Sequence, residues 1–414
     1  MKQKEEKASF QSEVLMRSIL EKFNKYSLPQ IKFVSSLVVL LMGMRVRCNF
    51  LNMGRYGMYH ERTYRAQFEK ELDWLSVNWS LVQDWVSEEL ILVFDPSYLP
   101  KSGKSTPNKG VYWNGCVGKA MPGLEIGELC VVDVRQNTGL HLKAYPTWDR
   151  GKLEEADWTL PQFYAQSLIG DQSFLEKISK VLVLDGYFTK NSFVDLIGSQ
   201  TNFTMISKLR VDGDLRYLYQ GLQQEGRGRP KQYAGKVDLK NIDKNRFVKI
   251  EEDHDKQVYH CICNIVNLKR NASIIYVAFK KEGKLTGKYQ VYACLDTDFD
   301  INKIYLYYKA RFQVEFLLRD SKQYTGLTHC EARREKALDF HFNASLTAIN
   351  LAKVRHHLDP NNKEKKVFSM ANIKTLYFNE LMLDFILSNF KIDPKLPENK
   401  IAIQKLLNLG KIAA

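Results

Sequence analysis

The sequence contains few cysteines, and their arrangement excludes two common kinds of small-domain scaffold. There are seven cysteines in 414 residues, which is an odd number, and no two of them form a Cys-x-x-Cys pair. This pattern argues against a disulfide framework and against a zinc module. We expect all seven cysteines to be reduced and to pack as small apolar side chains.

Long hydrophobic runs and a secretory signal are also absent. The most apolar run, from Phe33 to Met44, is too short to span a bilayer and is typical of a buried helix. The first ten residues, MKQKEEKASF, carry charges throughout and do not resemble a signal peptide. We therefore expect a soluble, cytoplasmic protein with no membrane partner.

The chain has fewer acidic than basic residues. Lys and Arg number 61 against 47 Asp and Glu, which gives a formal net charge of +14. Such a balance favours a polyanionic partner, nucleic acid first, although many basic proteins bind none. The length leaves room for two or three domains with ample core.

One stretch organises the rest of the chain: YKARFQVEFLLRDSK, from Tyr308 to Lys322. It has no Pro or Gly, and its apolar residues recur at helical period, which predicts a single helix. At about 100° per residue, Arg311, Glu315 and Arg319 share one face with Tyr308 and Lys322. A lone carboxylate among cations indicates either a solvated ion-pair ladder or a metal ligand with cations that reach for phosphates.

Two buried-strand patterns upstream each end at an aspartate. ELILVF runs into Asp95 and Pro96, and because Pro96 cannot donate to a ladder, we expect the strand to stop there. KVLVL ends in the same way at Asp185. The order of strands and helices between them predicts an α/β sheet with a mixed edge. The loop after Pro96, SYLPKSGKSTPNKG, either lies against a phosphate or is simply solvated.

These features together resemble DDE transposases of the insertion sequence 4 type. Their Tyr-Arg-Glu-Lys signature is matched by Tyr308, Arg311, Glu315 and Lys322 at the same spacing. The resemblance also covers ILVFDPSYLPKSGK, VLVLDGYF and residues 295–327, and less specifically most of residues 30–360. It implies an RNase H-like core in which the strands that lead to the two aspartates are neighbours.

The resemblance implies a transposase of a bacterial insertion sequence that cuts the element ends and joins them to target DNA. Asp95, Asp185 and Glu315 would be catalytic and would hold two Mg²⁺ ions, for which Mn²⁺ can substitute. Such an oxygen-only set of ligands suits these metals and two-metal phosphoryl transfer. Tyr308, Arg311, Arg319 and Lys322 would contact the DNA. The partners would be double-stranded DNA and a second copy of the chain, in the cytoplasm and on the nucleoid during the reaction.

Five regions are expected. They are a helical N-terminal DNA-binding domain (1–88), the first part of the RNase H-like core (89–211), a β-rich insertion (212–299), the catalytic helix with the helix that follows it (300–360), and a helical C-terminal tail (361–414). Residues 49–85 predict either a helix-turn-helix or an ordinary bundle with a basic surface. In the first case the DNA-facing side chains would be Arg55, His60, Arg62, Arg65 and Lys70.

The insertion contains GRGRPK, residues 226–231. Arg227, Arg229 and Lys231 would enter a narrow minor groove, or they belong to a generic basic loop. Relatives that cut through a DNA hairpin use a tryptophan of the insertion to hold a flipped base, whereas here all tryptophans precede residue 159. Tyr233, Phe247 or Tyr259 could stack on a base instead. Two other functions remain open, a nuclease that cuts without joining and a decayed copy that only binds DNA.

Overall fold

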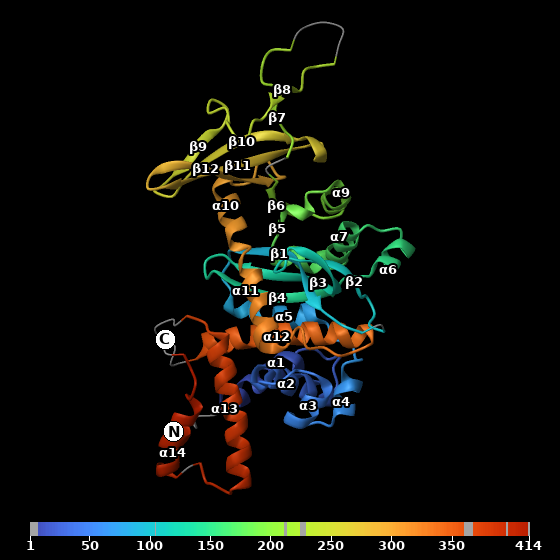
Figure 1. Cartoon of the computed structure of the whole chain (residues 1–414), viewed down its shortest axis with the longest axis vertical. Coiled ribbons are helices and arrows are strands. Elements are labelled where there is room, and N and C mark those ends of the chain that lie inside the picture. The colour runs from blue at the N-terminus through green and yellow to red at the C-terminus, as the bar shows by residue number, and fades with distance from the viewer. Residues whose placement is uncertain are drawn as a thin grey trace.

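The computed structural model describes residues 7–103, 105–210, 213–223, 229–359, 367–394 and 396–412. Arg227 and most of the charged linker expected at 361–367 lie outside these residues. The protein is a mixed α/β structure with one large sheet and many helices (Figure 1). No helix within the described ranges is both long and apolar enough to cross a bilayer.

The strands are β1 (Leu90–Pro100), β2 (Gly110–Asn114), β3 (Lys119–Asp133), β4 (Thr138–Pro146), β5 (Val181–Leu184), β6 (Thr204–Leu209), β7 (Leu215–Leu218), β8 (Tyr233–Lys236), β9 (Val248–Glu252), β10 (Lys256–Ile265), β11 (Arg270–Lys281) and β12 (Lys284–Cys294). Ten of them follow one another in the order β2-β3-β1-β5-β6-β12-β11-β10-β7-β8, while β4 pairs with β3 and β9 with β10. The strands of residues 215–294 thus continue the sheet that β1 begins, through the pairing of β12 with β6.

The helices are α1 (Ala8–Glu21), α2 (Leu28–Gly43), α3 (Phe50–Tyr56), α4 (Glu61–Gln67), α5 (Trp74–Val82), α6 (Arg150–Glu155), α7 (Leu160–Gly170), α8 (Gln172–Ile178), α9 (Asn191–Gln200), α10 (Ile301–Ala310), α11 (Gln313–Asp320), α12 (Glu335–Leu358), α13 (Met370–Asn389) and α14 (Pro397–Leu407). In Figure 1, α1–α5 lie below the middle of the sheet, while β7–β12 form the opposite end of the molecule. Helix α12 separates the sheet from α1 and α2.

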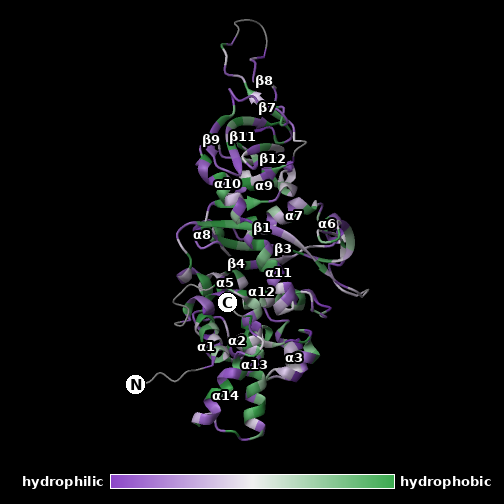
Figure 2. Ribbon diagram, turned by 60° about the vertical axis from the view of Figure 1, so that its left-hand side comes forward, coloured by the Kyte–Doolittle hydropathy of each residue, from purple (hydrophilic) through white to green (hydrophobic). Residues whose placement is uncertain are grey.

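The strands at the centre of the sheet are apolar and are hydrogen-bonded on both sides. β1 pairs antiparallel with β3 and parallel with β5, and β5 pairs parallel with β6. Ile91, Leu92, Val93 and Phe94 are fully buried, as a strand covered on both faces requires. Figure 2 accordingly shows the strands around β1 and β4 largely in the hydrophobic colour.

The prediction that the first strand stops at Pro96 was wrong. β1 continues to Pro100 and stays paired with β3, with Asp95 opposite Glu128 and Pro96 opposite Gly127. The parallel pairing with β5 ends at Phe94, so the strand beyond it has a partner on one side only. Proline is tolerated on such an edge because no hydrogen bond is lost there.

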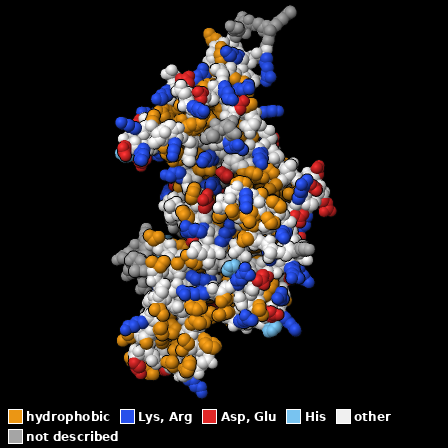
Figure 3. Space-filling model, viewed as in Figure 1, with side chains coloured by type: hydrophobic (Ala, Val, Ile, Leu, Met, Phe, Trp, Pro, Cys, Tyr) orange, Lys and Arg blue, Asp and Glu red, His pale blue; other side chains and the backbone are white. Residues whose placement is uncertain are grey.

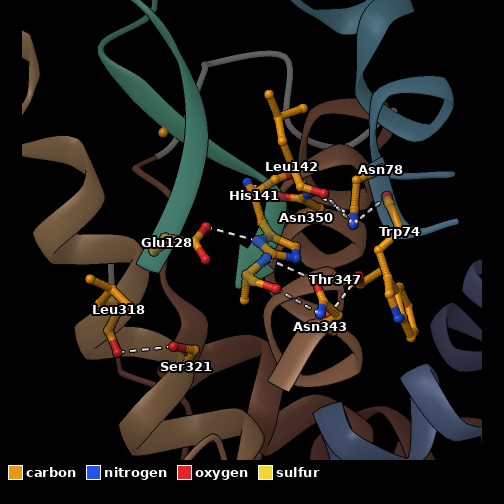
Figure 4. A network of polar contacts seen from close by, with 12 residues as sticks. Trp74, Asn78, Glu128, His141, Leu142, Leu318, Ser321, Asn343, Thr347 and Asn350 are labelled. Atoms are coloured by element: carbon orange, nitrogen blue, oxygen red, sulfur yellow. Dashed lines mark hydrogen bonds and ion pairs between the residues drawn. The ribbon is translucent and has the colours of Figure 1, made fainter. Parts of the chain in front are cut away.

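Helix α12 covers the edge of the sheet with asparagine side chains. The edge strand β4 pairs with β3 alone among the described strands. Asn350 accepts from the His141 amide at 2.8 Å and donates to its carbonyl at 2.7 Å, and Asn343 makes the same pair of bonds with Ala144 at 2.9 and 3.2 Å (Figure 4). The two asparagines are seven residues apart on the helix, and His141 and Ala144 are three residues apart on the strand. Both separations span about 10 Å, so each asparagine lies opposite its strand residue.

A buried His–Glu contact lies beside these asparagines. His141 Nδ1 is 2.7 Å from Glu128 Oε1, and both side chains are inaccessible to solvent (Figure 4). Burial raises the pKa of Glu128, although His141 acts in the opposite direction. Asn350 also donates to Asn78 of α5 at 3.0 Å, so one polar network joins the sheet, α12 and the N-terminal helices.

Candidate active site

The stretch predicted as a single helix is broken into two. α10 ends at Ala310, α11 begins at Gln313, and a π-helical turn follows from Ser321 to Thr325. At the junction the amides of Arg311 and Phe312 bond to carbonyls three residues back, each at 3.2 Å, which tightens the turn. The sheet below is twisted, and the bend lets α10 pack on β6 and β12 while α11 packs on β1, β3 and β4.

Arg311 lies at this junction and joins two of the predicted acidic residues. Its Nη1 is 3.2 Å from Asp95 Oδ1, and its Nη2 is 2.9 Å from Glu315 Oε1. The Arg311 side chain is only 9 % exposed, and its Nε has no hydrogen-bond partner among the described residues. One guanidinium therefore holds together the end of the β1–β5 pairing and the first turn of α11.

Asp185 reaches the same place from the next strand. Phe94 pairs in register with Leu184 on the parallel strand β5, so Asp95 and Asp185 are the next residues on two adjacent strands. Neighbouring strands are about 4.8 Å apart. The structure thus brings together Asp95, Asp185 and Glu315, which the sequence singled out.

Burial and the neighbouring carboxylates change the pKa of Asp95. Burial raises its pKa to about 7; Arg311 opposes the shift, while Asp185 and Glu315 add to it. Burial is thus the main cause of the raised pKa, and the cations Arg311 and Lys322 offset only part of it. A divalent cation bound here would remove this deficit of positive charge.

The remaining signature residues surround the acidic cluster in different ways. Lys322 Nζ donates to Ser97 Oγ at 2.8 Å and to the Tyr98 carbonyl at 3.0 Å, and burial lowers its pKa. The buried Tyr308 ring lies 4.6 Å from that of Tyr292 and 5.5 Å from the Arg311 guanidinium. Burial raises the pKa of Tyr308 to about 12, against the effect of Arg311, so its phenol remains a donor.

Arg319 is not part of this cluster. Its side chain is 61 % exposed and pairs with the adjacent Asp320 at 3.0 Å, and its guanidinium lies 4.9 Å from the Phe316 ring. Arg319 lies one helical turn beyond Glu315 in α11, and its guanidinium is directed to Asp320 and Phe316 rather than to Asp95. Arg319 is therefore left on the outside of α11.

The acidic cluster has the right chemistry for a hard cation, but its present arrangement does not form a complete metal site. Across the described parts of the chain, no group of three or more His, Cys, Asp or Glu side chains is placed to hold a metal ion. The Arg311 guanidinium occupies the space between Asp95 and Glu315. Carboxylate oxygens are the ligand type that Mg²⁺ and Mn²⁺ prefer, but in this structure two of the three carboxylates are paired with Arg311.

The basic residues predicted for groove binding lie elsewhere. Arg229 and Lys231 are exposed beside β8, seven strands away from β1 in the sheet order. Arg229 Nη2 contacts Gln232 Oε1 at 3.4 Å, and Lys231 Nζ lies 4.9 Å from the Tyr219 ring. At about 4.8 Å per strand, these two side chains are too distant to act in the acidic cluster.

Two of the three aromatic residues expected to stack on a base are buried. Phe247 is inaccessible and Tyr259 is 6 % exposed, because both rings pack beside Tyr276 in the core. The expectation that either of them stacks on DNA was therefore wrong. Tyr233 is partly exposed on β8, with the Arg216 guanidinium 5.6 Å from its ring.

Sequence reasoning missed the part played by Ser97 and Tyr98. Because β1 was expected to end at Pro96, both were assigned to a loop, whereas they are strand residues that bind Lys322. Alternation along a strand puts Ser97 on the same face as Asp95. The sequence did contain a signal for this role. After Pro96, the residues Tyr98 and Leu99 have the strand propensity that extends β1 to Pro100.

Comparison with known proteins gives little further guidance. No family model matches the sequence, and no curated protein matches it. Among solved structures, the chain is similar to the piggyBac transposase in a synaptic complex with hairpin DNA, determined by cryo-electron microscopy. The similarity has a TM-score of 0.44 at 12% identity and covers 98% of this chain and 86% of that one. At this level, function has to be argued from the site.

Proposed function

We propose that the chain is a DDE transposase of the insertion sequence 4 type, encoded by a bacterial insertion sequence. It would cut DNA at the element ends by metal-dependent phosphoryl transfer and join those ends to target DNA. One observation carries the proposal. Asp95, Asp185, Arg311 and Glu315, predicted from three distant parts of the sequence, meet at one point of the sheet.

The fold supports the proposal through its strand order. β4-β3-β1-β5-β6 is a run of neighbours in which β1, β5 and β6 are parallel and β3 is antiparallel to β1. An RNase H-like core has this arrangement, and its acidic residues stand at the ends of the two central strands. We propose that 89–211 and 300–360 form that core, with 212–299 as the insertion.

The roles of the residues follow from their positions. Asp95, Asp185 and Glu315 would hold two Mg²⁺ ions, which supply activation of the attacking hydroxyl and charge stabilisation of the leaving oxygen. Arg311 and Lys322 would exchange their present carboxylate, hydroxyl and carbonyl partners for phosphate oxygens. Tyr308, protonated at neutral pH, would donate a hydrogen bond to the same phosphate. No covalent protein nucleophile is needed.

Cleavage of DNA that carries the gene's own flanking ends tests this function. We expect strand cleavage at the end in the presence of Mg²⁺ or Mn²⁺, and a loss of at least about 100-fold in Glu315→Gln, as for the removal of an essential electrostatic group. Glu335→Gln is the matched control, because Glu335 is an exposed glutamate that pairs with Lys152 on the surface. A supercoiled target added to the reaction reports strand joining.

Each outcome decides between the functions. Cleavage with joined products supports the transposase, and cleavage without them supports a nuclease. Binding without cleavage by the unmodified protein would identify a decayed copy. Cleavage that survives Glu315→Gln would remove Glu315 from the site and contradict the proposal.

We also propose that two copies act together on paired ends. Large apolar side chains are exposed on α13, on α14 and in the segments that follow them, where Figure 3 shows hydrophobic atoms gathered at one end of the molecule. They include Phe385, Phe390, Ile401, Leu409 and Ile412, each at least 66% exposed. A contiguous apolar surface of this kind is typical of a protein interface.

A further inference from the structure

A large cleft lies where three segments far apart in sequence meet. Its walls come from the region of α3 and α4, from the loop that follows β1, and from the segment that leads into α12. Its volume is about 990 Å³, at the upper limit of small-molecule pockets. Pockets for small molecules are mainly apolar, whereas the lining of this cleft is strongly charged.

Cations outnumber carboxylates three to one along the cleft. The carboxylates are Glu69 and Glu331, and the cations are Arg47, Arg62, Arg65, Lys101, Arg333 and Arg334. Two buried or half-buried groups respond to this field. Burial lowers the pKa of Lys101; Cys330 and Glu331 oppose the shift, and Arg333 adds to it. Burial also lowers the pKa of His329, and Arg47 adds to that shift.

The cations of the cleft are only loosely neutralised by the protein. Arg47 is 3.8 Å from Glu331, and Arg334 is 3.8 Å from Glu69. Ion pairs this long between exposed side chains contribute little. Arg62 and Arg333 make no ion pair with any residue that the structure describes. Their charges are therefore available to an anionic partner.

The cleft and the acidic cluster lie at different points of the same strand, because Pro100 at the end of β1 and Lys101 after it line the cleft. Lys101 follows Asp95 by six residues, a distance of about 20 Å along an extended chain. Between them, Lys322 contacts the same strand at Ser97 and Tyr98. Cations thus follow β1 from the cluster to the cleft. Twenty ångströms of B-form DNA correspond to roughly six base pairs.

We propose that this cleft binds the phosphodiester backbone of duplex DNA roughly six base pairs from the point of cleavage. This proposal rests on the proposed function of the acidic cluster. Arg62, Arg333 and Arg334 provide the charge, and Ser102 and Thr328 line the same cleft with hydroxyl donors. Contacts of this kind fix the register of DNA on a protein without reading its sequence.

Binding of a fluorescein-labelled 40-bp duplex, measured by anisotropy in EDTA between 50 and 200 mM salt, tests the cleft. Each phosphate contact contributes about 0.9 to the slope of log K against log salt. We expect Arg333→Ala/Arg334→Ala to reduce that slope by about 1.8 and to weaken binding at least about 10-fold. Arg62→Glu is a second, independent variant. Arg150→Ala/Lys177→Ala removes two surface charges outside the cleft and serves as the control.

Two further binding measurements and the outcomes already described decide the result. A methylphosphonate placed roughly six base pairs from the cut should weaken binding to the unmodified protein but not to the Arg333/Arg334 variant. An unchanged salt slope in both cleft variants would overturn the cleft proposal, while cleavage that depends on Glu315 would still support the function. If the variants lose affinity only for single-stranded DNA or inorganic polyphosphate, the cleft does not bind duplex DNA, and the proposal is contradicted. Failure of the unmodified protein both to bind and to cut would remove both proposals.

Discussion

Arg311 is the residue on which the arrangement of the acidic cluster depends. It neutralises Asp95 and Glu315 in the same region where the proposed cations would bind. If the proposed divalent ions bind there, the guanidinium would compete with them for the same carboxylates. The competition predicts that DNA phosphates, by drawing Arg311 away, help the metal to bind.

The first prediction concerns this competition. Arg311→Gln removes the competing charge, so we expect Mn²⁺ to bind the DNA-free protein at least about 10-fold more tightly, as measured by isothermal titration calorimetry. Arg319→Gln is the control, because Arg319 is exposed and pairs with Asp320 rather than with the cluster. Equal Mn²⁺ affinity in the unmodified protein and the Arg311 variant would show that Arg311 does not compete with the metal ion for the carboxylates.

A second prediction concerns the pH dependence of stability through Glu125, away from the cluster. Burial raises the pKa of Glu125 to about 7, although a hydrogen bond from Tyr164 opposes the shift. The folded state therefore holds a proton that the unfolded state loses near pH 4.5, and this stabilisation is lost as the pH rises through about 7. Glu125→Gln imitates the protonated form and has no such loss.

Urea denaturation at pH 5 and pH 8 measures this effect. We expect the free energy of unfolding of Glu125→Gln, relative to the unmodified protein, to increase by about 3 kcal/mol between these pH values. Glu335→Gln, at an exposed position, should show no such increase. A constant difference at both pH values would mean that Glu125 is already ionised in the folded protein.

Among the elements, α12 contributes to the structure in two ways. It supplies apolar core between the sheet and the N-terminal helices, and its asparagines satisfy the backbone of the edge strand β4. An unpaired edge would otherwise leave donors and acceptors buried without partners. The same helix begins beside the basic cleft, so its packing also positions Arg333 and Arg334.

The third prediction tests this element. Asn350→Ala removes the side-chain partner of the His141 amide and carbonyl and of the Asn78 side-chain oxygen, all in a buried region. We expect a loss of about 3 kcal/mol in the free energy of unfolding, measured by chemical denaturation. Asn389→Ala, which removes only an exposed bond to the Phe385 carbonyl, should change it by less than about 0.5 kcal/mol. A small effect at Asn350 would show that water replaces the side chain.

At the scale of the whole molecule, the apolar surface of α13 and α14 lies far from the sheet (Figure 1). The fourth prediction is that Phe385→Ser/Phe390→Ser shifts the protein from dimer to monomer at micromolar concentration. Both rings are mostly exposed in the single chain, so in the proposed dimer they would supply apolar contact area, which the serines would remove. Sedimentation velocity with and without DNA ends measures this. Leu285→Ser, at an exposed site on β12, is the control, and a monomeric unmodified protein on paired ends would contradict the dimer.

Local pattern in the sequence determined several features by itself. Apolar runs predicted β1 and β5, and their ends marked Asp95 and Asp185, because a buried strand has to be apolar until it reaches an edge. The spacing of Arg311 and Glu315 placed them on one face, since residues four apart on a helix are neighbours. The resemblance to one family rested on those same residues.

Only the tertiary structure decided the rest. The break at Arg311, the extension of β1 to Ser97 and Tyr98, and the exclusion of Arg319 all depend on how a twisted sheet and the elements packed on it fit together. The burial of Phe247 and Tyr259 and the convergence of three segments at the basic cleft also need long-range packing. A sequence pattern records which face of one element is apolar, whereas contacts between distant elements are fixed when the chain folds.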